Sequence, residues 1–299
     1  MSEPQHRPVM VREVLERLAP GPGQIILDAT VGLGGHSARI LGRLGPGGRL
    51  LGIDRDPEAL RSARNRLEAV GEGFFLHHGR FSQIGEALRA AGVQTEGGLH
   101  GILFDLGVSS YQLDTADRGF GFSREGILDM RMDPGTGESA GDLLRRIPVG
   151  EIERILREFG EEPSARKIAR VIDRRRSGGA LRTTADLARA VEEVVPRQGR
   201  RTHPATRTFQ AIRIAVNDEL TEIRQALLDI DRYLAPGGRV VVVSYHSLED
   251  RIVKTVLHER EREGILDVDR PDPAVPGEEE IEENPRARSA KLRSAARRA

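Results

Sequence analysis

The sequence predicts an α/β protein built on a doubly wound, mostly parallel sheet, with a mainly helical domain inserted into it. Three observations carry this prediction. Short apolar runs alternate with helical patterns near both ends of the chain, a glycine-rich turn follows the first apolar run, and the alternation is interrupted midway by helical patterns alone. We therefore expect a first sheet segment at 1–113, an inserted helical domain at 114–212 and a second sheet segment at 213–299.

Length and composition limit the class of protein. The chain has 299 residues, of which 38% are hydrophobic, enough for the core of one large or two moderate domains. It contains no cysteine, which excludes disulfides and thiolate metal sites. It has no apolar run long enough to span a bilayer, and its first residues lack the apolar core of a signal peptide. We expect a cytoplasmic protein without a membrane partner.

The glycine-rich turn predicts a site for a nucleotide-type cofactor. It runs from Asp28 to Ser37 (DATVGLGGHS) and follows the apolar run 25–27, which is typical of a buried parallel strand. Glycines at 32, 34 and 35 allow backbone NH groups and a helix start to approach a ligand closely. The dinucleotide pattern G-x-G-x-x-G fails because Ser37 occupies its last glycine position. A tight turn without a ligand is the alternative.

Further alternation follows the turn. Asp54 ends the apolar run 50–53, where a second parallel strand would bring a carboxylate to ribose hydroxyls. Asp56 is expected to cap a crossover helix that begins at Pro57. Later strands are expected at 74–76, 102–104 and 239–245, and a helix is expected from about 217 to 234.

Asp105 is the candidate catalytic residue, because it follows the fourth expected strand and so adjoins the cofactor crevice. The glycine turn, with Asp28 at the end of its strand, resembles the first motif of S-adenosylmethionine-dependent methyltransferases, which implies methyl transfer. If the acceptor is an exocyclic amine on a base, it is a poor nucleophile, since its lone pair is delocalised into the ring. A carboxylate that accepts its hydrogen bonds would favour a reactive, pyramidal nitrogen aligned with an electrophilic methyl group. The alternative is that Asp105 merely caps the following turn.

Basic residues are concentrated in the inserted domain and in the last residues of the chain. The insertion combines helical patterns, one of which Thr184 could cap, with many arginines, and it is either a solvated face or a basic surface for nucleic acid. The segment 284–299 has cations and no acidic residue, and it is either a disordered end or a phosphate-binding tail. The cations expected to hold RNA phosphates are Arg197, Arg200, Arg201, Arg207, Arg288, Lys291 and Arg293.

Long matches distributed along the chain resemble the bacterial 16S ribosomal RNA cytosine-N4 methyltransferase family. In four positions the sequence departs from what is usual there: Gly121 replaces Ser, Ile127 replaces Pro, Tyr245 replaces Phe and Ala287 replaces Ser. The matching stretches are His6–Met10, Asp28–Ser37, Gly52–Pro57, Phe104–Leu113, Arg118–Asp133, Pro204–Arg213, Val216–Leu220, His246–Arg251 and Arg288–Arg293.

This resemblance implies a class I methyltransferase fold and S-adenosylmethionine as cofactor. It also implies a cytidine in the decoding region of small-subunit ribosomal RNA as substrate. The residues alone also point to Asp54, Asp105 and the turn glycines, whereas Phe81, beside the adenine, and Gln112 come only from the resemblance. The implied cofactor contacts are Gly34, Gly35, His36, Asp54, Phe81, Asp105 and Gln112.

Other chemistries are open at this point. Ser247 near His246 could suggest a hydrolytic triad, but no G-x-S-x-G elbow precedes it. Asp129 and Asp133 flank Arg131 and could line a metal site or form a salt-bridged loop. We expect no metal, because methyl transfer needs none. A nicotinamide-dependent oxidoreductase and a non-catalytic RNA-binding protein are the alternative functions.

Overall fold

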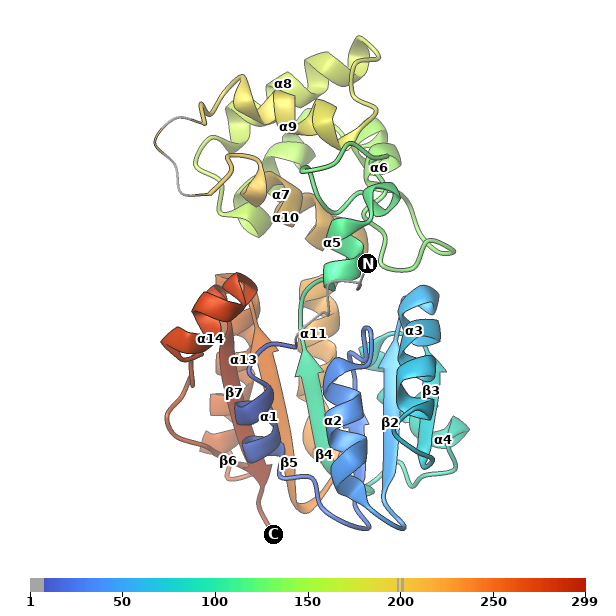
Figure 1. The fold of residues 1–299 in the computed structure, drawn as a ribbon. Helices are drawn as coiled ribbons and strands as arrows, with labels where there is room; N and C mark the ends of the chain where they lie inside the picture. Colours follow the sequence, from blue (N-terminus) through green and yellow to red (C-terminus); the bar gives the residue numbers. More distant parts are fainter. Residues whose placement is uncertain (1–7, 198, 200–201) are drawn as a thin grey trace. The chain divides into compact units, whose positions relative to one another are not determined.

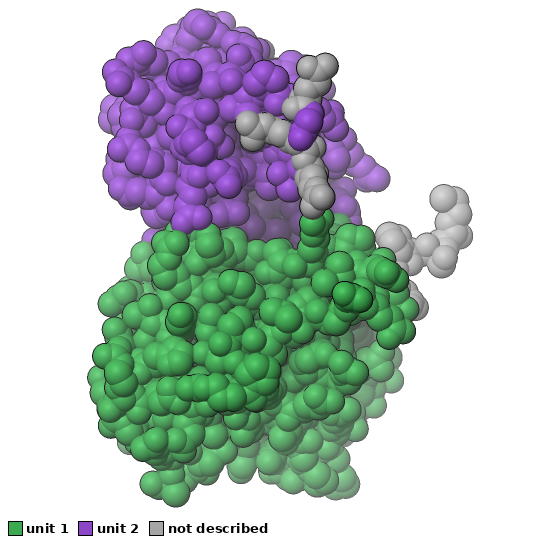
Figure 2. Space-filling model, turned by 90° about the vertical axis from the view of Figure 1, so that its left-hand side faces the viewer, with its two compact units in different colours: residues 1–107, 220–299 green, residues 108–219 purple. Residues whose placement is uncertain are grey.

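The computed structural model describes residues 8–197, 199 and 202–299, and it divides into two compact units. The sheet unit comprises residues 1–107 and 220–299, and the helical unit comprises residues 108–219 (Figure 2). The helical unit thus begins earlier and ends later than the insertion expected at 114–212. The predicted Arg200 and Arg201, and the start of the stretch His6–Met10, lie outside the described residues.

The sheet unit contains seven strands in the order β3-β2-β1-β4-β5-β7-β6. The first five are parallel, and β7 runs antiparallel to both of its neighbours (Figure 1). This confirms the predicted α/β class with a mostly parallel sheet. The strands are β1 (Ile25–Asp28), β2 (Arg49–Asp54), β3 (Phe74–His78), β4 (Leu99–Asp105), β5 (Leu234–Ser244), β6 (Leu266–Val268) and β7 (Lys291–Arg297).

Helices cover both faces of the sheet. On one face α1 (Val11–Leu18), α2 (Gly35–Leu44) and α3 (Pro57–Glu68) pack against alternate strand residues such as Leu103 and Val241. The intervening residues, such as Ile102 and Val242, face α4 (Ile84–Ala90), α11 (Glu219–Leu228) and α13 (Ser247–Arg262) on the other face (Figure 1). Burial on both faces explains why these strands read as continuous apolar runs.

Helix boundaries were predicted with mixed success in the sheet unit. Asp56 caps α3 as expected, because its carboxylate accepts hydrogen bonds from the NH groups of Glu58 and Ala59. The single helix expected to continue to Leu234 was wrong. The chain forms α11 and a short α12 (Ile230–Tyr233), and Leu234 already pairs with Leu99 as the first residue of β5. Pairing with β4 requires the extended backbone of Leu234 (φ −75°, ψ 139°), and the helix is already interrupted at Asp229.

The helical unit has its own apolar core, contributed by the helices that the sequence predicted and by their neighbours. One cap was displaced by a residue: Thr183 caps α9, while the buried Thr184 hydroxyl accepts a hydrogen bond from the Gly126 NH. No helix in the described part of the chain is both long and apolar enough to cross a membrane. The helices of this unit are α5 (Ser110–Asp114), α6 (Ala140–Arg146), α7 (Val149–Gly160), α8 (Ala165–Ser177), α9 (Thr184–Glu192) and α10 (Thr206–Asn217).

The C-terminal segment is part of the sheet, so the predicted phosphate contacts of Lys291 and Arg293 are wrong. Arg293 in β7 is only 4% exposed, and its guanidinium binds Asp250 at 2.8 Å and Asp272 at 2.6 Å. Lys291 binds the second oxygen of Asp250 at 2.9 Å. These cations therefore neutralise buried carboxylates within the sheet unit. Arg288, which is exposed, remains a predicted phosphate contact.

Replacing Arg293 by alanine should strongly destabilise the sheet unit. The change leaves Asp250 and Asp272 without their shared partner, and breaking a buried pair in this way costs about 3–5 kcal/mol. The matched control is Arg298→Ala, since Arg298 is 48% exposed and its pair with Asp267 should contribute at most about 1 kcal/mol. Urea unfolding of both variants measures the difference, and equal unfolding midpoints would contradict the structural role of Arg293.

Candidate active site

Three carboxylates lie at the carboxyl edge of adjacent parallel strands. Asp28, Asp54 and Asp105 are the last residues of β1, β2 and β4. The strand register pairs Asp28 with Gly52 on one side and with Leu103 on the other, so the three strands end close together. In open α/β sheets this edge is where ligands bind. The structure therefore places Asp54 and Asp105 at one edge, as the sequence predicted.

The turn between β1 and α2 requires its glycines. Gly32 and Gly34 have φ angles of +51° and +78°, which favour glycine. A Cβ at Gly34 would lie 3.1 Å from the Ala63 Cα, and one at Gly35 would lie 2.4 Å from the Pro8 Cγ. The backbone here therefore approaches α3 and the N-terminal segment more closely than any side chain would allow.

Asp28 holds the turn from inside the protein. Its side chain is buried and accepts hydrogen bonds from the Ser37 hydroxyl at 2.6 Å and the Thr30 NH at 3.1 Å. Burial raises the pKa of Asp28 to about 6, although these hydrogen bonds act in the opposite direction. Asp28 therefore fixes the first turn of α2 to the end of β1 and is too buried to serve as a ligand contact.

Asp54 links the second strand to the glycine turn. Its Oδ2 accepts a hydrogen bond from the Gly32 NH at 2.7 Å, and its Oδ1 accepts one from the Asp56 NH at 2.8 Å. Burial raises the pKa of Asp54 to about 6 despite both bonds. The carboxylate is partly buried and lies beside the turn, which is the place expected for a ribose contact.

Asp105 has one oxygen engaged and one available. Its Oδ1 accepts a hydrogen bond from the Tyr245 hydroxyl at 2.7 Å, while its Oδ2 lies 3.5 Å from the His36 Nε2. Burial raises the pKa of Asp105 to about 7, although the side chain keeps 22% of its exposure. Ser109, rather than Asp105, caps the following helix α5. The capping alternative for Asp105 is therefore not supported.

His36 is the second residue of α2 and is buried. Burial lowers the pKa of His36, which keeps the ring neutral near pH 7. A neutral imidazole next to Asp105 contributes no positive charge to the site, so the role of His36 as a cofactor contact remains a prediction.

Phe81 and Gln112, which only the resemblance suggested, lie in different structural environments. Phe81 begins the short 3₁₀ helix after β3, and its ring packs edge-on against Phe104 with centroids 6.0 Å apart. It is partly buried, which leaves part of the ring accessible. Gln112 belongs to the helical unit, where it forms a reciprocal capping box with Ser109. Both remain predicted cofactor contacts.

Sequence reasoning missed two residues that contact Asp105. The Thr30 hydroxyl accepts a hydrogen bond from the Asp105 NH at 2.6 Å, and Tyr245 donates to its carboxylate. Both follow the ends of strands that neighbour β4, namely β1 and β5. Finding them would have required the strand order, which the sequence did not supply.

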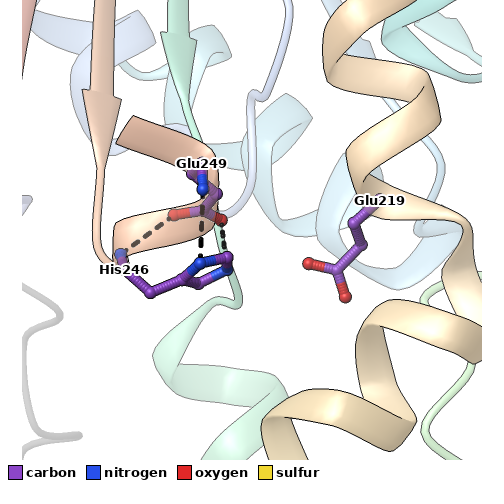
Figure 3. A group of neighbouring side chains, drawn as sticks. All are labelled: Glu219, His246 and Glu249. Carbon is purple, nitrogen blue, oxygen red and sulfur yellow. Dashed lines mark hydrogen bonds and ion pairs between the residues drawn. The ribbon is translucent and has the colours of Figure 1, made fainter. Parts of the chain in front are cut away.

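The polar cluster after β5 is a helix cap. The His246 Nδ1 accepts a hydrogen bond from the Glu249 NH at 3.4 Å, and Glu249 Oε2 accepts one from the His246 NH at 3.2 Å (Figure 3). Glu249 Oε2 also accepts a hydrogen bond from the Tyr245 NH at 2.8 Å. This capping box accounts for His246 without a hydrolytic role. Glu219, also drawn in Figure 3, belongs to the helical unit and binds Arg213 through both oxygens.

The loop that could have been a metal site is salt-bridged. Arg131 binds both carboxylate oxygens of Asp129 at 2.8 Å, and Asp133 accepts a hydrogen bond from the Gly135 NH. The guanidinium thus occupies both carboxylate oxygens of Asp129. The salt-bridged alternative is therefore the one that the structure contains.

Comparison with known proteins identifies the family. The model of the MraW methylase family matches residues 3–298. A ribosomal RNA small subunit methyltransferase H from Trichlorobacter lovleyi is 47% identical, covering 99% of both chains. Proteins of the same name from Methylococcus capsulatus (49% identical; 97% of this chain, 100% of that one) and Rubrobacter xylanophilus (47%; 100% and 98%) are similarly close. The chain belongs to the MraW methylase family, and it is an S-adenosylmethionine-dependent methyltransferase.

Proposed function

We propose that the protein transfers a methyl group from S-adenosylmethionine to the exocyclic N4 amine of a cytidine in the decoding region of small-subunit ribosomal RNA. Family membership and the names of the full-length relatives support the methyltransferase activity and the RNA class. The observation that carries the reaction is Asp105, whose carboxylate lies at the ligand-binding edge with one oxygen not engaged by any described residue.

The turn after β1 and the end of β2 would hold the cofactor. The Gly34 and Gly35 backbone can approach it closely, together with the NH of His36, and Asp54 would accept hydrogen bonds from the ribose hydroxyls. Phe81 offers an accessible aromatic ring for the adenine. When bound, S-adenosylmethionine supplies an electrophilic sulfonium methyl group. These residues fix the position of that methyl group without taking part in the bond changes.

Asp105 would act on the amine. Its ionised carboxylate would accept a hydrogen bond from the N4 amino group and so localise the nitrogen lone pair for attack. The nitrogen–carbon bond would form as the carbon–sulfur bond breaks, S-adenosylhomocysteine would leave, and the proton that the amine loses would pass to the carboxylate. Because Oδ1 already accepts a hydrogen bond from Tyr245, the ionised form is the one that keeps Oδ2 free to accept from the amine. Because the pKa of Asp105 is raised to about 7, protonation on moving from pH 8 to pH 6 removes most of the active form.

The helical unit offers a candidate RNA surface on α8, but not at all the positions predicted. Arg174 and Arg175 bind Glu193, and Arg176 binds Asp173 and two backbone carbonyls. Arg207 donates to the Glu161 carbonyl. These arginines support the unit itself, so they are poor candidates for phosphate contacts.

Three cations at the start of α8 are different. Arg166, Lys167 and Arg170 are exposed, and their side chains make no hydrogen bond or ion pair with any described residue. The first turn of α8 contains no acidic residue, and cations at a helix N-terminus oppose the helix dipole. Arg166 and Lys167, which lie in the first turn, therefore gain nothing from the dipole of α8, and we propose that they and Arg170 bind phosphates of the RNA.

A direct assay tests the proposed function. The protein is incubated with labelled S-adenosylmethionine and small ribosomal subunits, and the modified nucleoside is mapped by mass spectrometry. N4-methylcytidine in the decoding region is the expected product. A label on another base, on protein or on no component of the subunit would contradict the proposal.

Asp54→Ala should weaken S-adenosylmethionine binding by about one to two decades, because charge-assisted hydrogen bonds contribute about 1.5–3 kcal/mol. Calorimetric titration measures the dissociation constant. Asp54→Asn is the graded control, since it keeps one of the two oxygens that support the Gly32 and Asp56 NH groups. An unchanged affinity in Asp54→Ala would show that β2 does not end at the cofactor.

Asp105→Asn should reduce the methyl-transfer rate more than it reduces cofactor affinity, because the carboxylate acts on the amine chiefly in the transition state. Single-turnover kinetics at saturating cofactor measure the rate. The parent enzyme should lose activity as pH falls through about 7, and the variant should lack this titration. A variant rate within about threefold of the parent, with collapsed cofactor binding, would make Asp105 only a cofactor contact.

Replacing Arg166, Lys167 and Arg170 together by glutamine should weaken subunit binding and make it less dependent on salt. Each lost phosphate contact should flatten the slope of log affinity against log salt by about 0.7–0.9. Subunit binding at several salt concentrations provides the slopes, while cofactor affinity should not change.

The control for this triple variant removes the same charge from the sheet unit. Arg39, Arg43 and Arg64 are also exposed and have no described partner, and they lie on α2 and α3. Their replacement by glutamine should leave the salt slope close to that of the parent. Equal slopes for the two triple variants would show that α8 has no special role in RNA binding.

A further inference from the structure

Tyr245 forms a hydrogen bond with Asp105, the candidate catalytic residue. It directly follows β5, the strand that neighbours β4 on the side opposite β1, and Val243 pairs with Asp105 in the sheet. Its hydroxyl donates a hydrogen bond to Asp105 Oδ1 at 2.7 Å. A phenylalanine at this position could pack in the same way but could not make the contact.

The tyrosine is held firmly enough to position its partner. The Tyr245 NH donates to Glu249 Oε2 at 2.8 Å, which ties its backbone to the first turn of α13. On its other side the ring lies against Gly107, where an added Cβ would be 3.2 Å from the Tyr245 Cδ2. Gly107 has a φ angle of +95°, so the backbone that follows Asp105 also requires glycine.

The contact leaves the two oxygens of Asp105 in different situations. Oδ1 is engaged by the phenol, whereas Oδ2 makes no hydrogen bond with any described residue and lies 3.5 Å from His36 Nε2. A carboxylate fixed at one oxygen presents the other in a defined direction. A substrate amine would therefore meet Oδ2.

We propose that Tyr245 is a positioning residue for methyl transfer, whose phenol keeps Asp105 ionised and directs Oδ2 toward the amine. The inference rests on the proposed function. Tyr245 itself touches neither the amine nor the methyl group, so it acts only through Asp105.

The groups around Asp105 come from four elements. Asp28 lies at the end of β1, His36 in α2, Glu249 in α13 and Tyr245 after β5. Burial and the negative charge of Glu249 raise the pKa of Asp105, while the hydrogen bond from Tyr245 lowers it. His36 is kept neutral by burial and so supplies no counter-charge. Among these groups, only the Tyr245 hydroxyl donates a hydrogen bond to the Asp105 carboxylate. Its loss would therefore raise the pKa of Asp105.

The test is the pH profile of Tyr245→Phe, measured as the single-turnover methyl-transfer rate on small subunits at saturating cofactor. A hydrogen bond to a charged group corresponds to about one to two pH units, so the acid limb of the profile should move upward by that amount. At pH 6 the variant should be at least about tenfold slower than the parent, and above the shifted limb the two rates should converge. Cofactor affinity should be unchanged.

Tyr233→Phe is the matched control, because Tyr233 is also partly buried in the sheet unit but its hydroxyl makes no described hydrogen bond. Its profile should coincide with that of the parent. Coincident profiles for Tyr245→Phe and the parent would overturn the inference, as would a uniform loss of rate with an unmoved acid limb. If the parent itself methylates no subunit RNA, the proposed function fails instead, which distinguishes the two failures.

Discussion

The hydrogen bond between Ser37 and the buried Asp28 is the interaction on which the rest of the site depends. It connects the first turn of α2 to the end of β1, and a buried carboxylate deprived of such a partner would carry a large desolvation penalty. Asp54 then holds the intervening turn from the second strand through Gly32. The turn is thus held by hydrogen bonds from two strands without a ligand. Cofactor binding therefore costs little conformational entropy in this turn.

The basic residues divide into those that stabilise the fold and those that are candidates for RNA binding. The formal net charge is zero, yet the arginines are used in distinct ways. Arg293 compensates two carboxylates inside the sheet unit, and Arg176 closes a helix–loop junction inside the helical unit. At the start of α8, by contrast, the cations are exposed and unfavourably placed with respect to the helix dipole. Their location, rather than the number of arginines in the chain, identifies a candidate polyanion surface.

The sequence was sufficient for features that are encoded locally. The strands β1 to β4, the glycine turn and the Asp56 cap depend on short apolar runs and on neighbouring residues, and they were predicted close to their observed positions, whereas β6 and β7 were not predicted. It was insufficient where partners lie far apart along the chain. Arg293 meets Asp250 and Asp272 only after β7 joins the sheet, and Tyr245 meets Asp105 only because β4 and β5 are neighbours. The sequence alone therefore does not show whether a basic residue is paired with a carboxylate of the same protein or is free to bind phosphate.

The strand order has a consequence for how the protein is made. β1 to β4 are synthesised before the helical unit, whereas β5, which covers one edge of β4, is synthesised after it. While residues 108–219 emerge from the ribosome, β4 has a neighbour on one side only, and an apolar strand with an uncovered edge is prone to pair with other chains. The insertion has its own apolar core, so it can bury its apolar residues during this interval without adding to the surface that is exposed before β5 is made.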